Sequence, residues 1–255
     1  MGELHHLKVG CADCSVIRTS SHTFLVDASN ISDWSHLLPS NKRLRGVFIT
    51  HQHYDHFDGL KYLKDKGYRI DFLVHSPYER RYGDNSVQYD EWQEFNALRD
   101  HFVNNGTDAR APHRQTDFSK PWWDAGEVKF WILGPSQAIA SSETRQLHDA
   151  ALVVHAALNK LRCLFTGDAS DANLEDVASN VNNICGGILH ASHHGSIEGA
   201  SLPFIQACKA THTVISTESG VHENVPHPTA LRRYKENTSH AVYRTDVDGA
   251  LTWTF

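Results

Sequence analysis

The sequence lacks any long apolar run. No stretch of its 255 residues approaches the ~20 consecutive apolar residues that a membrane-spanning helix needs. We therefore expect no membrane partner. The N-terminal residues M-G-E-L-H-H-L-K also lack the apolar core of a secretory signal peptide, so we expect a cytoplasmic protein.

Cysteine is too sparse and too irregular for a disulfide framework. The chain has 5 cysteines, and C-x-x-C occurs once, at Cys11 and Cys14. A zinc knuckle usually takes a second such pair. We expect reduced, partly buried thiols, with a zinc knuckle or a redox pair as the alternative.

Positive charge is also in short supply. Lys and Arg number 24 against 30 Asp and Glu, which gives a formal net charge of −6. This balance argues against a protein that coats nucleic acid. It does not exclude a nuclease, because bound metal ions can hold a phosphate locally. The pattern G-x-S-x-G is absent as well, which argues against covalent serine catalysis.

Strand and helix patterns alternate along the chain, which indicates sheets covered by helices in an α/β or α+β class. Strands are predicted at 7–19, 22–28, 44–50, 70–75, 128–135, 150–158, 161–168, 186–192, 212–217, 241–245 and 250–255. Helices are predicted at 59–66, 88–104, 173–178, 203–210 and 228–237.

Residues 76–123 differ from the rest because they are polar and rich in aromatic residues. We interpret them as a helical and aromatic insertion. It can be an excursion that packs on the sheet, or a lid or substrate platform beside a site.

Four residues of the kinds that bind metals follow the predicted strand 44–50: His51, His53, Asp55 and His56. Two neutral imidazoles separated by one residue can converge on one cation, while Asp55 and His56 can reach a second. Nitrogen and carboxylate ligands of this kind suit zinc, manganese or iron.

The motif H-x-H-x-D-H after a strand resembles the signature of the metallo-β-lactamase superfamily. Within that superfamily the chain is most similar to the ComEC-type hydrolase domain and its standalone relatives. Further matching segments follow in the family's order: L-K-V-G-C-A-D-C-S-V-I-R, F-L-V-D-A, L-F-T-G-D-A, S-H-H-G-S, H-P-T-A-L-R-R-Y and Y-R-T-D-V-D-G-A-L. The resemblance implies one α+β domain over 1–255, folded as a four-layer αββα sandwich. It also implies two divalent metal ions, Zn²⁺ or Mn²⁺.

The same resemblance assigns ligands elsewhere in the chain. Asp168 would bridge the two ions, and His194 would bind the second, with His193 beside it or facing substrate. His148 would supply a third imidazole to the first ion, although a surface-loop histidine explains it equally well.

The implied activity is hydrolysis by a hydroxide shared between two ions, which Asp55 could also orient. The first hypothesis is a phosphodiesterase or nuclease acting on DNA or nucleotides, in which His227 contacts the phosphate or protonates the leaving oxygen. The alternatives are hydrolysis of another ester, such as a phosphocholine ester, a lactone or a thioester, and a metal-stabilised binding module of a defence or toxin assembly.

Overall fold

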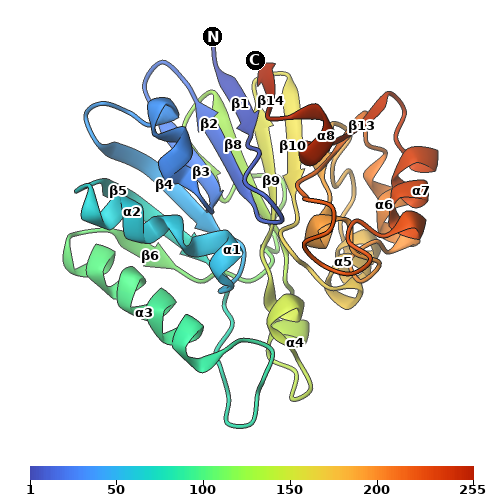
Figure 1. Cartoon of the computed structure of the whole chain (residues 1–255), viewed down its shortest axis with the longest axis horizontal. Helices are drawn as coiled ribbons and strands as arrows, with labels where there is room; N and C mark the ends of the chain where they lie inside the picture. Colours follow the sequence, from blue (N-terminus) through green and yellow to red (C-terminus); the bar gives the residue numbers. More distant parts are fainter.

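Two seven-stranded sheets pack face to face, and helices cover both outer faces (Figure 1). The computed structural model describes residues 1–255. The expected α+β class and four-layer arrangement are therefore confirmed.

The first sheet, sheet A, has the strand order β14-β1-β2-β3-β4-β5-β6. Strands β3, β4 and β5 run parallel, and the outer pairs β1–β2 and β1–β14 are antiparallel. Its strands are β1 (Glu3–His6), β2 (Cys14–Arg18), β3 (Thr23–Ala28), β4 (Arg43–Ile49), β5 (Arg69–His75), β6 (Asp108–Arg110) and β14 (Leu251–Thr254).

The second sheet, sheet B, has the order β13-β12-β11-β10-β9-β8-β7. Strands β10 to β13 run parallel, and β9 forms an antiparallel hairpin with β10 as expected. Its strands are β7 (Trp123–Asp124), β8 (Val128–Gly134), β9 (Val153–Leu158), β10 (Leu161–Phe165), β11 (Ile188–His190), β12 (His212–Ile215) and β13 (Ala241–Arg244).

The α-helices are α1 (Tyr54–Phe57), α2 (Gly59–Asp65), α3 (Tyr89–Asn104), α4 (Gln137–Ala140), α5 (Asp171–Asn180), α6 (Leu202–Cys208), α7 (Pro228–Asn237) and α8 (Thr245–Asp248). Three 3-10 helices are η1 (Ile31–Leu37), η2 (Leu147–Ala150) and η3 (Ser192–Gly195).

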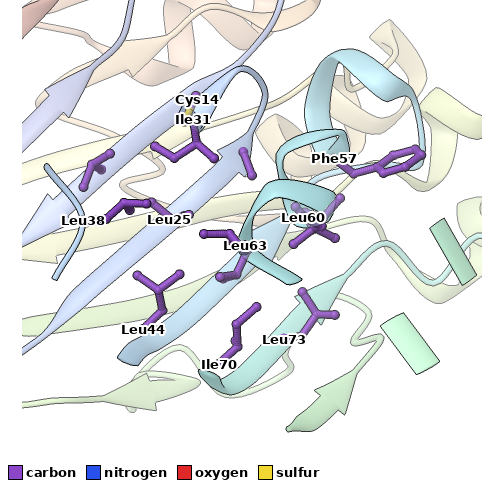
Figure 2. Packing of buried hydrophobic residues seen from close by; sticks show 14 of the residues in the cluster. Cys14, Leu25, Ile31, Leu38, Leu44, Phe57, Leu60, Leu63, Ile70 and Leu73 are labelled. Atoms are coloured by element: carbon purple, nitrogen blue, oxygen red, sulfur yellow. The ribbon is translucent and has the colours of Figure 1, made fainter. Parts of the chain in front are cut away.

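Buried side chains hold the helices of the first layer on sheet A. Leu60 and Leu63, three residues apart and hence on one side of α2, join Leu25 and Leu73 of the sheet in one hydrophobic cluster (Figure 2). Phe95 of α3 belongs to the same cluster. Each fully buried side chain of this size contributes about 1.5–3 kcal/mol relative to exposure.

A second cluster lies between the sheets and a third lies under the helices of sheet B. Phe24 and Phe48 of sheet A share the inner cluster with Phe130 of sheet B. On the outer face of sheet B, Leu174 of α5 and Phe204 of α6 are in one buried cluster with sheet residues. Three apolar seams thus separate four layers.

The N-terminal part of the chain differs from the prediction. The strand predicted for 7–19 begins only at Cys14, because residues 7–13 form the connection from β1. Strand β1 itself was not predicted. Its partners on both sides are β2 and the C-terminal strand β14, so much of its pairing is remote in sequence and leaves no local pattern.

Residues 76–123 contribute both a helix and strands. Helix α3 lies against sheet A, as the excursion interpretation expects, and Phe95, Leu98 and Phe102 form its buried side. The segment also supplies β6, which extends sheet A beside β5. Its description as an insertion, and the single domain over 1–255, stay predictions.

None of the helices combines the length and the apolar character that crossing a bilayer requires. The five cysteines are all free, and four of them are buried, among them Cys14. The expected thiols, rather than a disulfide framework, are therefore present.

Candidate metal centre

The candidate site lies where strands of both sheets end. Asp27 is the penultimate residue of β3, His51 follows β4, and Asp168 follows β10. The parallel direction of β3 with β4, and of β10 with β11, brings these ends to one edge of the sandwich. Ligands bound by parallel sheets commonly sit at such strand ends.

A first ligand group consists of His51, His53, His148 and Asp168, whose ligand atoms all lie within 4.8 Å of one another. His51 Nε2 is 3.1 Å from His53 Nδ1, and His148 Nε2 is 3.3 Å from the same atom. The sequence left His148 open between a ligand and a surface residue. The structure places it in this group.

A second ligand group consists of Asp55, His56, His194 and Asp168, also within 4.8 Å of one another. His194 Nε2 is 3.3 Å from Asp55 Oδ2, and His56 Nε2 is 3.3 Å from Asp168 Oδ1. All seven residues predicted as ligands therefore fall into these two groups.

Asp168 belongs to both groups and turns a different oxygen to each. Its Oδ1 is 3.6 Å from His194 Nε2 on the second side. Its Oδ2 is 3.8 Å from His51 Nε2 and 3.9 Å from His148 Nε2 on the first. A carboxylate has two oxygens that can each bind a cation, so this placement suits a bridging ligand.

The spacing of these atoms suits metal ions. Two ligand atoms about 2.0–2.1 Å from a tetrahedral ion lie about 3.3–3.4 Å from each other. Three atoms in the second group, His56 Nε2, His194 Nε2 and Asp168 Oδ1, are buried without a hydrogen-bond partner. Buried polar atoms in proteins almost always have a partner, and a shared cation would satisfy all three.

In several of these histidines, the ring nitrogen that points away from the site contacts an oxygen acceptor. His53 Nε2 contacts the Ser86 carbonyl, His56 Nδ1 contacts Asp27 Oδ2, and His194 Nδ1 contacts the Ser216 carbonyl, each at 3.0 Å. A ring that donates N–H there keeps the lone pair of its other nitrogen toward the site. Metal-binding histidines usually have such a partner.

The histidines of the two groups differ in pKa. Burial lowers the pKa of His148 to about 4, and burial together with the neighbouring His56 lowers the pKa of His51 well below its usual value. Both imidazoles are therefore neutral, which is the form that binds metal. Burial opposes a charge on His194, but Asp168 and Asp55 outweigh it and raise the pKa of His194 to about 9. The carboxylates of the second group thus require a positive charge.

The loop after β11 is strained at the two histidines. His193 and His194 have φ angles of 51° and 52°, in the left-handed region that residues other than glycine rarely adopt. This conformation turns neighbouring side chains in different directions. His194 is 5 % exposed and joins the second group, whereas His193 is 26 % exposed and lies 3.7 Å from Asp168 Oδ2. The predicted role of His193 beside the substrate stays a prediction.

A cleft of 590 Å³ opens over the two groups. His227 lines it and forms the N-cap of α7, where its Nδ1 accepts a hydrogen bond from the Thr229 amide at 3.1 Å. The sequence reasoning missed further lining residues, namely Cys11, Ser196, Ile197, Glu198, His222, Glu223, Asn224 and Val225. They lie on loops, where no periodic pattern indicates which way a side chain points.

Comparison with known proteins finds a family match over part of the chain. Residues 9–119 match the model of the metallo-β-lactamase superfamily. No curated protein sequence matches the chain. The matched segment contains His51, His53, Asp55 and His56.

Solved structures share the fold over the whole chain. The metallo-β-lactamase fold protein YhfI from Bacillus subtilis is 12% identical, with a TM-score of 0.59 and 99% of each chain covered. The diiron β-hydroxylase CmlA from Streptomyces venezuelae is 15% identical, with a TM-score of 0.58, covering 100% of this chain and 54% of that one. A diphosphatase from the PhnP family is 13% identical, with a TM-score of 0.53, covering 100% and 98%. At these identities the likeness establishes the fold alone.

Proposed function

We propose that this chain is a metallo-β-lactamase superfamily hydrolase that uses two divalent metal ions, Zn²⁺ or Mn²⁺, to cleave phosphodiesters. The observation that carries the proposal is the position of Asp168, which turns one oxygen to each of two groups of histidines. Two ions about 3.5–4 Å apart would lower the pKa of a water and stabilise charge on a phosphoryl oxygen.

The chain's own residues would each have a separate task. His51, His53 and His148 would hold one ion, His56 and His194 the other, and Asp168 both. Asp55 is 36 % exposed, more than the other carboxylate of the second group. It could therefore orient an attacking water besides binding metal. His193 and His227 border the cleft, where they could contact substrate oxygens.

The lining of the cleft favours a small substrate over a long nucleic acid. The residues that line it include Glu198 and Glu223 but no lysine or arginine. Proteins that bind extended nucleic acids neutralise successive phosphates with basic side chains. A nucleotide or another small phosphodiester, whose one phosphate the metal ions can neutralise, fits this lining better than DNA.

Two further possibilities remain as outcomes of the test. The same site could hydrolyse another ester, such as a phosphocholine ester, a lactone or a thioester. A metal-stabilised binding module of a defence or toxin assembly would keep the metals but show no turnover. The closer resemblance to the ComEC-type hydrolase domain also belongs to this proposal.

A substrate panel with the metal-loaded protein tests the proposal. It comprises bis-p-nitrophenyl phosphate, a dinucleotide, single- and double-stranded DNA, RNA, a phosphocholine ester, a lactone and a thioester, each with Zn²⁺ and with Mn²⁺. We expect hydrolysis of the small phosphodiesters, with loss of activity in Asp168→Asn. Turnover of the lactone or thioester alone would assign the protein to that substrate class instead of phosphodiesters. An absence of all turnover in a fully metal-loaded protein would favour the binding module.

A further inference from the structure

Ser86 contacts two chain segments of the first ligand group, one that carries His53 and one that carries His148. It lies in the loop between β5 and α3. Its carbonyl oxygen accepts a hydrogen bond from His53 Nε2 at 3.0 Å. Its hydroxyl oxygen accepts one from the backbone N–H of Leu147 at 2.9 Å. Leu147 directly precedes His148, so one residue is tied to two candidate ligands that are 95 positions apart.

The contact with His53 decides which ring nitrogen faces the site. A carbonyl only accepts, so Nε2 of His53 must carry the proton that it donates to Ser86. Nδ1 then keeps its lone pair, and this atom faces His51 Nε2 at 3.1 Å and His148 Nε2 at 3.3 Å. The Ser86 carbonyl therefore sets both the tautomer and the rotation of the His53 ring.

Two side chains in turn fix the conformation at Ser86. Asp84 Oδ1 accepts hydrogen bonds from the Ser86 backbone N–H at 2.9 Å and from its hydroxyl at 2.7 Å. Asp84 Oδ2 accepts a hydrogen bond from the hydroxyl of Tyr78 at 2.5 Å. Tyr78 is 3% exposed, so it anchors the loop in the protein interior. The hydroxyl of Ser86 thus donates to Asp84 while it accepts from Leu147.

Packing alone does not hold this loop in place. A cavity of 560 Å³, lined by residues 81–86 and 143–146, flanks it. Water rather than a packed side chain therefore faces the loop on that side. Val87, the next residue, packs in a buried cluster with Tyr78 and Leu147. The hydrogen bonds of Asp84 and Ser86 add the polar restraints that act on Ser86 itself.

We propose that Ser86 is a positioning residue that aligns His53 and His148 for the first metal ion, with Asp84 and Tyr78 as its support. The proposal rests on the two-metal site inferred above. It assigns a function to residues 76–123, because their first part positions ligands of the first group and none of the second. Ser86 itself binds no metal, so its effect passes through the two histidines.

The test is metal binding to the purified full-length protein by Ser86→Ala. The variant keeps the carbonyl but loses the hydroxyl that ties the loop to Asp84 and Leu147. We expect one of the two ions to bind roughly 10–100-fold more weakly, the usual effect of removing a partner that orients a metal ligand. The second ion should keep its affinity. Titration with Co²⁺ followed by its visible spectrum measures the two steps separately.

Two variants serve as controls. Ser86→Thr retains a hydroxyl and should restore binding of the first ion. Ser142→Ala also removes a hydroxyl near the cavity, but that hydroxyl contacts Thr144 and no metal-ligand segment, so both affinities should match the unaltered protein. The proposal would be overturned if Ser86→Ala bound both ions with the same affinities as the unaltered protein. It would also be overturned if the variant bound both ions more weakly to a similar extent and its metal-free form had a lower melting temperature. Metal binding is read without substrate, so a failed phosphodiesterase assay leaves this test intact.

Discussion

Replacing His227 by alanine should separate substrate contact from metal binding. The residue lines the cleft from the start of α7, and no ligand atom of either group comes from it. Its Nδ1 accepts a hydrogen bond from the Thr229 amide, so in the neutral ring the proton is on Nε2. That nitrogen can donate to an anionic phosphate oxygen. A neutral ring cannot also give this proton away, so the geometry favours phosphate positioning over protonation of the leaving oxygen.

The size of the effect follows from this contact. A hydrogen bond to a charged group contributes about 1.5–3 kcal/mol, which corresponds to roughly a 10–150-fold loss in kcat/KM. General-acid catalysis would instead account for about 10²–10⁴-fold, with most of that loss absent on a nitrophenyl ester, whose leaving group needs little protonation. His227→Ala also removes the helix cap, which costs about 1 kcal/mol and lowers Tm by roughly 2–4 °C.

His227→Asn is the matched control, because asparagine also caps helices but is too short to replace Nε2. The assay compares kcat/KM on bis-p-nitrophenyl phosphate and on a dinucleotide, together with Tm and metal content. We expect His227→Asn to keep Tm, while both variants lose rate equally on the two substrates. Full activity in His227→Ala would refute a role for this side chain. A loss confined to the dinucleotide would restore the general-acid role, and loss of an ion would make His227 a ligand.

Three further outcomes follow from the same structure. Chelation should abolish hydrolysis and lower Tm, because an ion present at 100 times its Kd stabilises the fold by about 2.7 kcal/mol; an unchanged Tm after verified metal removal would contradict this. Asp27→Ala should weaken the ion of the second group by roughly 10–100-fold, because Asp27 accepts from His56 and Thr50, and equal weakening of both ions in a Co²⁺ titration would argue against it. Phe48→Ala should cost about 3–5 kcal/mol in urea unfolding, because Phe48 is 0% exposed and its ring centroid lies 4.5 Å from that of Phe130; a cost below about 1 kcal/mol would be inconsistent with this packing.

The sequence predicted the parts of the site that are local in the chain. His51, His53, Asp55 and His56 stand within one short segment after an apolar strand, so their spacing alone indicates convergence on cations. Asp168 and His194 needed the family resemblance, because each is an ordinary turn residue when considered alone. For His148 the sequence could not decide, and only the packing of η2 against the other loops places it beside His53.

Contacts made by backbone atoms were beyond sequence reasoning. The Ser86 and Ser216 carbonyls orient His53 and His194, but every residue has a carbonyl, so no residue type marks these positions. The pairing of β1 with β14 is hidden for a different reason. It joins Glu3 to Thr254 across almost the whole chain, and a strand of four residues is too short to show a clear alternation.

Metal content measured by elemental analysis tests the central claim most directly. After dialysis against Zn²⁺ or Mn²⁺, the unaltered protein should retain about two ions per chain, as expected of a two-metal site. Asp168→Asn keeps the size of the side chain but replaces the shared carboxylate, so its content should fall clearly below that of the unaltered protein. A single ion in the unaltered protein, or an unchanged content in Asp168→Asn, would contradict a centre in which Asp168 joins two metals.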